Sequence, residues 1–269
     1  MKLTGNTVLI TGGGSGIGRG WAEALHDLGN TVIVSGRCEA RLAAVAAERP
    51  GIHTIKLDVS REDDIRAATE SILHRWPDLN VLLNNAGVLE PDDPSGPMDA
   101  RAVTDTVATN FTGSVLMSSA LIGHLKQREN AVVLYTSSAA AFVPLPIAAV
   151  YSATKAALHA FALCQRSMLR PYGVQVVEIV PPWVRTDLMN SREAVLAMPV
   201  GEFIAQALTL LGSGCDEVIV EAAKGLRASA GSDDQKAVDG FLELVRTALQ
   251  KGNSTASKSS NGVAEQSAG

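Results

Sequence analysis

The sequence is poor in cysteine, with only Cys38, Cys164 and Cys215 spread over 269 residues. No two of them form a C-x-x-C pair, so the sequence offers neither a disulfide framework nor a zinc site. We therefore predict no bound metal. Sparse, unpaired cysteines are typical of a reducing compartment, and we expect a cytoplasmic protein.

The sequence also lacks an excess of basic charge. Its 23 lysines and arginines are outnumbered by 28 acidic residues, which gives a net charge of -5. An acidic chain has no electrostatic reason to bind nucleic acid or an anionic membrane surface. It contains no run of about 18 apolar residues, and its opening segment, MKLTGNTVLITGGG, has no apolar signal-peptide core. We expect no membrane segment and no nucleic-acid partner.

What the sequence does contain is a regular alternation of short apolar runs and longer amphipathic segments. Runs rich in Val, Ile and Leu are typical of strands covered on both faces. The helical segments expected between them cover residues 16–28, 39–49, 61–76, 99–127 and 150–169. The predicted strands are TVLIT, TVIVSG, HTIKLDV, VLLNNAG, AVVLYTSS, VQVVEIV and EVIV. This alternation predicts a single Rossmann-like, doubly wound α/β domain, with about seven parallel strands flanked by helices on both faces.

The domain is expected to span residues 1–251. Residues 188–211 read as a helical insertion before the last strand, and we expect them to form a lid over the substrate. From residue 252 the sequence becomes GNSTASKSSNGVAEQSAG. This composition buries little apolar surface, so residues 252–269 are predicted to form a disordered tail.

A glycine-rich loop, TGGGSGIG, follows the first predicted strand and opens the first helix. Gly12, Gly16 and Gly18 allow tight turns and a close approach of the backbone to a phosphate. The start of the helix offers free N–H groups and a positive dipole end to a pyrophosphate. A glycine-rich turn without a ligand is the alternative. The position between strand and helix favours a nucleotide cofactor.

A second pattern places Tyr151 four residues before Lys155, at the start of a predicted helix. Residues i and i+4 share one helix face, so the phenol and the ammonium can converge. Free tyrosine has a pKa of about 10, and a nearby positive charge lowers it. Such a tyrosine can exchange a proton with an alcohol or carbonyl oxygen. A surface lysine unrelated to a half-buried tyrosine is the alternative, which the upstream glycine loop disfavours.

These motifs recur together in one known family. The glycine spacing G-x-x-x-G-x-G, the NNAG segment after the fourth strand, and then Asn110, Ser138, Tyr151 and Lys155 follow one another in order. In this the chain resembles the short-chain dehydrogenase/reductase family over about residues 5–220. The segments PPWVRT, AFVPL and AMPVGEF are similar to a bacterial oxidoreductase branch named after the D-alanine transfer operon. In PPWVRT, Pro182 replaces the family's glycine, and we expect a stiffer loop with altered substrate access.

The resemblance implies roles for these residues. Tyr151 would be the catalytic acid or base, and Ser138 would stabilise the charge that develops on the substrate oxygen. Lys155 would bind the nicotinamide ribose, and Asn110 would hold a water in a proton relay through that lysine. Ser137 is the neighbouring alternative to Ser138, but the family's thirteen-residue spacing to the tyrosine selects Ser138. The resemblance assigns cofactor binding to Gly12, Ser15, Gly16, Ile17, Gly18, Arg37, Asp58, Val59, Asn85, Ala86, Gly87, Tyr151, Lys155, Pro181, Val184 and Thr186.

The end of the second predicted strand bears on which nicotinamide binds. NAD-preferring members carry an acidic residue there, whereas this chain has Gly36 followed by Arg37. A guanidinium suits a 2′-phosphate, and Arg41 can assist, so NADP(H) is favoured over NAD(H). Asp58 would contact the adenine, with a helix cap or turn as the alternative. Ser60 is the likelier cap for the helix that follows.

The substrate is expected to be a hydrophobic ketone or secondary alcohol. The segment AAAFVPL after Ser138 is wholly apolar, and Trp183 with the predicted lid would form the opposite wall. Plain core packing is the alternative. Two rival functions are a non-catalytic NADP(H)-sensing protein, and an epimerase or dehydratase of the extended branch. In the family, the two long helices, expected here over residues 99–127 and 150–169, pair across a two-fold axis. The resemblance therefore implies a homodimer or homotetramer.

Overall fold

The computed structural model describes residues 1–231, 240, 243, 244 and 247, except for the side chains of residues 190 and 192. The predicted tail, residues 252–269, lies outside the described residues.

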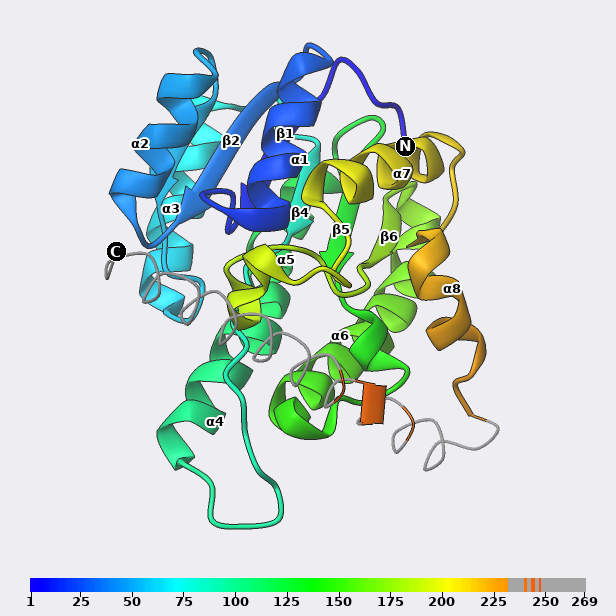
Figure 1. Cartoon of the computed structure of the whole chain (residues 1–269). Helices are drawn as coiled ribbons and strands as arrows, with labels where there is room; N and C mark the ends of the chain where they lie inside the picture. Colours follow the sequence, from blue (N-terminus) through cyan, green and yellow to red (C-terminus); the bar gives the residue numbers. More distant parts are fainter. Residues whose placement is uncertain (232–239, 241–242, 245–246, 248–269) are drawn as a thin grey trace, which may run out of the picture.

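The predicted parallel sheet is confirmed. It has seven strands in the order β3-β2-β1-β4-β5-β6-β7, and each neighbouring pair is parallel (Figure 1). The strands are β1 (Thr7–Thr11), β2 (Thr31–Gly36), β3 (His53–Lys56), β4 (Val81–Asn84), β5 (Val132–Thr136), β6 (Gln175–Val180) and β7 (Glu217–Ile219). The strand order reverses between β1 and β4. In open parallel sheets, the crevice beyond this point is where ligands bind.

Helices cover both faces of the sheet. One apolar core lies between the sheet and α1, α2, α7 and α8, and the other between the sheet and α3, α5 and α6. The longer helices are α1 (Gly16–Asp27), α2 (Glu39–Glu48), α3 (Glu62–Arg75), α4 (Ala100–Val107), α5 (Gly113–Leu125), α6 (Ala149–Leu169), α7 (Val200–Gly212) and α8 (Glu221–Ala228). Short helical turns are η1 (Ala108–Thr112), η2 (Ala139–Ala141), η3 (Pro146–Ala148), η4 (Arg170–Tyr172) and η5 (Leu188–Glu193).

The helix predicted over residues 99–127 contains an irregularity that the sequence pattern did not reveal. Between α4 and α5 the chain makes a π-helical turn, η1, and Asn110 lies in the middle of it. A π turn accommodates one extra residue per turn and is frequent at functional sites. Its effect here is to aim the Asn110 side chain at the loop after β4.

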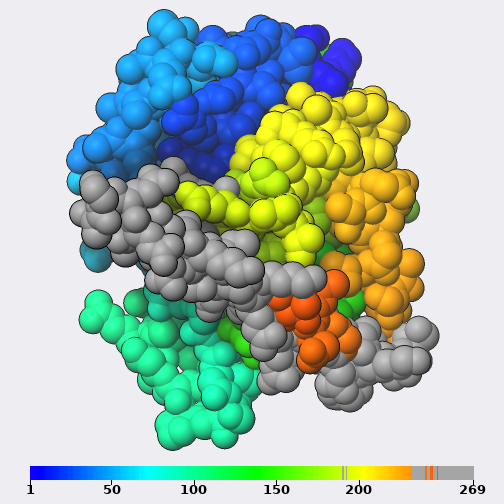
Figure 2. All heavy atoms as spheres, viewed as in Figure 1, coloured from blue at the N-terminus to red at the C-terminus, as the bar shows by residue number. Residues whose placement is uncertain are grey.

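The predicted lid over residues 188–211 divides into two parts. Its first part is the turn η5, and its second is most of α7, whose Phe203 and Leu211 are fully buried. Figure 2 shows α7 in yellow, packed beside the blue amino-terminal segment. In this structure α7 therefore closes the core, and η5 is the part that lies near the catalytic residues.

Two details depart from the sequence-based expectations. Ser60 does not cap α3, because its hydroxyl and its N–H both donate to the carboxylate of Asp58, at 2.7 and 3.0 Å. The helical stretch Pro146–Tyr172 is long and apolar enough, by length and composition, to cross a membrane. Its sequence contains no uninterrupted apolar run of that length, because polar residues such as Tyr151 and Lys155 interrupt it. Here this stretch is a core helix, since Leu158 and its neighbours pack against the sheet.

Candidate active site

The loops after β1 and β4 are joined at the point where the strand order reverses. The hydroxyl of Thr11 accepts hydrogen bonds from the N–H groups of Asn85 and Ala86, at 3.0 and 3.1 Å. The Asn85 amide donates back to the Thr11 carbonyl at 3.1 Å. This clamp places the glycine loop directly beside the NNAG segment.

The glycines of the loop are needed for the close approach of these backbones. Gly12 has a φ of +68°, and a Cβ there would lie 2.8 Å from the Cα of Ala86. A Cβ on Gly18 would lie 2.4 Å from the Asn85 amide and from the Gly12 carbonyl oxygen. The Ser15 side chain does not cap α1, and the first turn of α1 holds no acidic residue. The uncapped N–H groups and positive helix end fit a pyrophosphate.

A third segment, the loop after β6, borders this crevice. The Thr186 methyl lies 3.2 Å from where a Cβ on Gly16 would be. Val184 is buried, and the Pro181 carbonyl accepts from the Ala139 N–H at 2.9 Å. Pro182 sits in a trans peptide, since the chain has no cis bonds among its described residues. Thr186 of this loop thus lies beside the glycine loop.

The predicted catalytic residues converge at the start of α6. The Lys155 side chain is buried, and its ammonium donates to the Thr136 carbonyl at 2.8 Å. That ammonium lies 5.5 Å from the centre of the Tyr151 ring. The Ser138 side chain hydrogen-bonds the Tyr151 phenol and also accepts from the Ala140 N–H at 3.1 Å. The tyrosine, lysine and serine therefore form one cluster.

The electrostatics of this cluster differ from the sequence-based expectation. Burial raises the pKa of Tyr151 to about 12, and the hydrogen bond from Ser138 only partly opposes this. Burial also lowers the pKa of Lys155 to about 8, against the opposing charge of Glu178. Desolvation disfavours both charged forms, and it is the largest cause of each shift.

The Asn110 side chain joins two segments of the site. Its side chain is fully buried, and its carbonyl oxygen accepts from the Val88 N–H at 2.8 Å. Its amide donates to the Val88 carbonyl at 2.8 Å and to the Thr154 hydroxyl at 3.2 Å. These bonds fasten the loop after β4 to α6. The side chain thereby holds Gly87 and Lys155 near each other. A Cβ on Gly87 would lie only 3.6 Å from the lysine nitrogen.

Comparison with known proteins agrees with this arrangement. A family model described as short chain dehydrogenase matches residues 6–196. The chain belongs to the short-chain dehydrogenase family. The uncharacterized oxidoreductase DltE of Bacillus subtilis is 40% identical over 239 residues, covering 87% of this chain and 95% of that protein. The resemblance read from the sequence is confirmed.

Two solved structures share the fold and carry cofactors. A short-chain dehydrogenase from Burkholderia cenocepacia in complex with NADP has a TM-score of 0.73 and 26% identity, covering 93% of this chain and 98% of that one. A 3-ketoacyl-(acyl-carrier-protein) reductase from Brucella melitensis, complexed with NADH, has a TM-score of 0.72 and 27% identity, covering 83% and 94%. This short-chain dehydrogenase is an NAD(P)-dependent oxidoreductase.

One residue important to the dehydrogenase site escaped the sequence analysis. Asp92 lies 57 residues before the start of α6, yet its two carboxylate oxygens accept from the N–H groups of Ala149 and Val150, at 2.8 and 2.9 Å. A carboxylate at a helix start satisfies free N–H groups and complements the helix dipole. Asp92 thus fixes the turn that carries Tyr151. No local pattern signals such a long-range cap.

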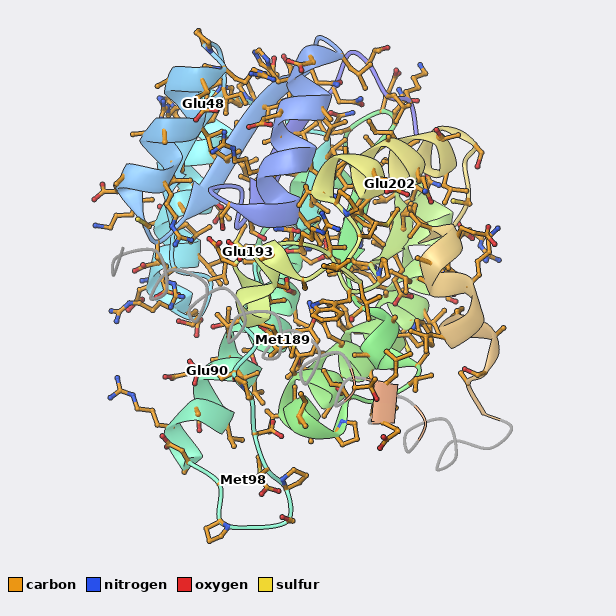
Figure 3. All side chains as sticks on the ribbon, viewed as in Figure 1. Glu48, Glu90, Met98, Met189, Glu193 and Glu202 are labelled. Atoms are coloured by element: carbon orange, nitrogen blue, oxygen red, sulfur yellow. The ribbon has the colours of Figure 1, made fainter. Side chains whose placement is uncertain are left out.

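The surroundings of Tyr151 are apolar. Ala140, Leu145 and Ala148 pack with the tyrosine into a small buried cluster. Met189 of η5, labelled in Figure 3, and Leu89 pack against this cluster from the loops. The guanidinium of Arg185, the basic side chain of the β6 loop, donates to the carbonyls of Ala194, Val195 and Ala197.

The residues predicted to meet the adenosine lie at the ends of β2 and β3. Arg37 is exposed directly after β2. Arg41, in the first turn of α2, flanks the glycine loop, because a Cβ on Gly14 would lie 3.3 Å from the Arg41 Cβ. Its guanidinium lies 3.4 Å from the Asp187 carboxylate. Asp58 forms the turn with Ser60 described above, and Val59 after it is buried.

Proposed function

We propose that this dehydrogenase transfers hydride between NADP(H) and an apolar ketone or secondary alcohol. The observation that carries the proposal is the position of the Tyr151 phenol, which lies beside Ser138 and Lys155 and within an apolar cluster. Bound nicotinamide supplies or accepts the hydride at the carbon of the substrate. The protein must then deliver or remove one proton at the oxygen.

The residues present can perform that proton transfer. In reduction, the Tyr151 phenol donates its proton to the carbonyl oxygen, and the high pKa of the buried phenol suits a proton donor. The Ser138 hydroxyl stabilises the charge that develops on that oxygen. The Lys155 ammonium, one helix turn away, then stabilises the phenolate that is left. In oxidation, the same proton returns to Tyr151.

The apolar cluster supports the choice of substrate class. The wall formed by Ala140 and Leu145 offers no partner for a carboxylate, and the Arg185 guanidinium already binds backbone carbonyls. A hydrophobic group beside the reacting carbonyl would displace water without leaving a charge unpaired.

The experiment that tests the proposal follows NADPH absorbance with a panel of aryl and aliphatic ketones. We expect ketone-dependent oxidation of NADPH that favours the more hydrophobic ketones, because their transfer into the apolar wall is favourable. The same assay with small anionic keto acids is the matched comparison. Turnover of the keto acids without turnover of aryl ketones would contradict the substrate class. NADPH binding without turnover of any ketone or alcohol would favour the sensor alternative.

We also propose a preference for NADP(H), supported by the exposed guanidinium of Arg37 after β2 and by Arg41 beside the glycine loop. Replacing Arg37 with alanine should weaken NADPH binding about tenfold, because a charged hydrogen bond to phosphate contributes about 1.5 kcal/mol. NADH affinity should be unchanged. Fluorescence titration with both nucleotides measures this, with Arg101→Ala on α4 as the control. Equal losses for NADPH and NADH would show that Arg37 does not read the 2′-phosphate.

We further propose that the protein forms a homodimer or homotetramer through α4, α5 and α6. The proposal is supported by the apolar side chains that α4 and α6 leave exposed. These are Val107, Leu163 and Met168, which are 38%, 42% and 72% exposed.

A further inference from the structure

A buried carboxylate lies behind the catalytic helix, outside the set of residues described above. Glu178 on β6 is fully buried, and one of its carboxylate oxygens accepts no hydrogen bond. The other lies 2.6 Å from Nδ1 of His159. Burying a charged group is costly unless it is paired. An incompletely paired carboxylate at this place therefore calls for a reason.

The geometry connects Glu178 with the catalytic lysine. His159 and Lys155 are one turn apart on α6, so they share the helix face that packs on the sheet. The Lys155 ammonium is bonded to the carbonyl of Thr136 on β5. The residue before it, Tyr135, is the register partner of Glu178 on the neighbouring strand. The carboxylate thus lies on the strand next to the carbonyl that holds the ammonium, one residue away in register, in a buried interior where charges interact strongly.

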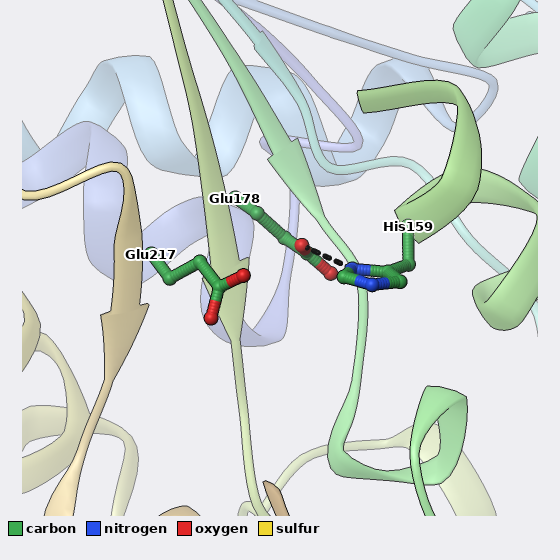
Figure 4. Close-up of side chains that lie close together, drawn as sticks. All are labelled: His159, Glu178 and Glu217. Atoms are coloured by element: carbon green, nitrogen blue, oxygen red, sulfur yellow. Dashed lines mark hydrogen bonds and ion pairs between the residues drawn. The ribbon is translucent and has the colours of Figure 1, made fainter. Parts of the chain in front are cut away.

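The other charges of this region cancel one another. Glu217 on β7 is the register partner of Glu178, but both its oxygens accept from the Arg227 guanidinium, at 3.2 and 3.4 Å. Figure 4 shows Glu178 between Glu217 and His159. These three side chains place ligand-type atoms within 4.8 Å of one another. Because Arg227 already neutralises Glu217, Glu178 is the carboxylate of this group that is left to act on Lys155.

The groups that face Lys155 can be assigned element by element. The titratable or charged ones among the described residues are Tyr151 and His159 on α6, Glu178 on β6, and the Glu217–Arg227 pair of β7 and α8. The turn η1 contributes the neutral Asn110, and β5 contributes a carbonyl. Of these, Glu178 is the charge that favours the ammonium, opposing the lowering of the Lys155 pKa by burial.

We propose that Glu178, oriented by His159, is a positioning residue that keeps the buried Lys155 charged, and through it sustains binding of the nicotinamide ribose. The proposal rests on the proposed function for the role of Lys155, but its electrostatic core can be tested without cofactor. If Glu178 had only a structural role, it would anchor α6 to the sheet. Its replacement would then lower stability and leave the titration of Lys155 unchanged.

The direct experiment is a ¹³Cε-lysine NMR titration of the whole protein from pH 6 to 11, with the Lys155 signal assigned through Lys155→Arg. Lys155 should titrate near 8, apart from the other lysines. In Glu178→Gln we expect its midpoint to fall by about one pH unit, because the charge that favours the ammonium is gone. The matched control is Glu217→Gln, whose Lys155 midpoint should stay near that of the wild type.

Two variants of His159 separate charge from folding. His159→Gln keeps an N–H donor for Glu178, and its Lys155 midpoint should stay close to that of the wild type. His159→Leu removes the hydrogen-bond partner of the buried carboxylate, so Glu178 is no longer oriented toward the ammonium, and the Lys155 midpoint should fall as in Glu178→Gln. A thermal melt of each variant reports the structural contribution separately.

Cofactor affinity then tests the functional half. In Glu178→Gln, Lys155 becomes neutral at a lower pH than in the wild type. As the pH is raised, the NADPH affinity of the variant should therefore decline about one pH unit before that of the wild type. A Lys155 midpoint unchanged in Glu178→Gln, whatever its melting temperature, would overturn the inference, as would an equal shift in Glu217→Gln. A shifted midpoint in a protein that binds neither NADPH nor NADH would uphold the Glu178–Lys155 coupling and reject the proposed function.

Discussion

Replacing Tyr151 with phenylalanine is expected to lower kcat for ketone reduction by about 1,000-fold, because the variant loses its proton donor. The ring would remain in its cluster with Ala140, Leu145 and Ala148, so the fold and the apolar wall should persist. NADPH affinity should stay within about threefold of the wild-type value, since the variant loses at most one hydrogen bond to the cofactor. The measurements are steady-state kinetics with the best ketone of the panel and NADPH fluorescence titration.

The matched control is Tyr135→Phe. Tyr135 is also a buried tyrosine, and its hydroxyl donates at 2.8 Å to the side chain of Gln165, which lies fourteen residues beyond Tyr151 on α6. Loss of this bond should lower the free energy of unfolding by about 1 kcal/mol and leave kcat close to that of the wild type. If Tyr151→Phe kept more than a tenth of wild-type activity, another group would have to donate the proton.

Gly18→Ala is expected to weaken NADPH and NADH binding about 100-fold, by displacing the loop that holds their phosphates. The added Cβ would lie 2.4 Å from both the Asn85 amide and the Gly12 carbonyl oxygen. The carbonyl is backbone and cannot rotate away, so the loop must shift, and a displacement of about 1 Å at a binding site costs about that factor. Overpacking should also lower the free energy of unfolding by about 2 kcal/mol.

Gly123→Ala provides the comparison. Gly123 lies in α5, and a Cβ there would meet nothing within 4 Å. Alanine should stabilise the helix by about 0.5–1 kcal/mol without changing cofactor affinity. Fluorescence titration and chemical denaturation measure both effects. Unchanged nucleotide affinity in a folded Gly18→Ala protein would show that the cofactor does not bind at this loop.

Much of the site was predictable because its signals are local. The glycines of the first loop mark a backbone that approaches another backbone closely, and the structure shows this at Gly12 and Gly18. The four-residue spacing of Tyr151 and Lys155 places them on one helix face by helical geometry alone. The apolar runs predicted buried parallel strands, because strands covered on both faces do not alternate between apolar and polar residues.

Other features depend on contacts between residues that are far apart in the chain. Asp92 caps a helix that begins 57 residues later, and Asn110 fastens a loop through a π turn that resembles ordinary helix in sequence. The second part of the expected lid, α7, packs its apolar face on the sheet. None of these has a periodicity or a motif that a local reading can detect.

The sequence by itself determined the order of strands and helices, the glycine loop and the pairing of Tyr151 with Lys155, because each depends on local periodicity or on short spacing. The tertiary structure alone decided the electrostatics. Burial raised the pKa of the tyrosine and lowered that of the lysine, and strand register placed Glu178 next to Tyr135, one residue from the carbonyl that Lys155 binds. The cost of desolvating a charge depends on everything packed around it, and packing exists only once the chain has folded.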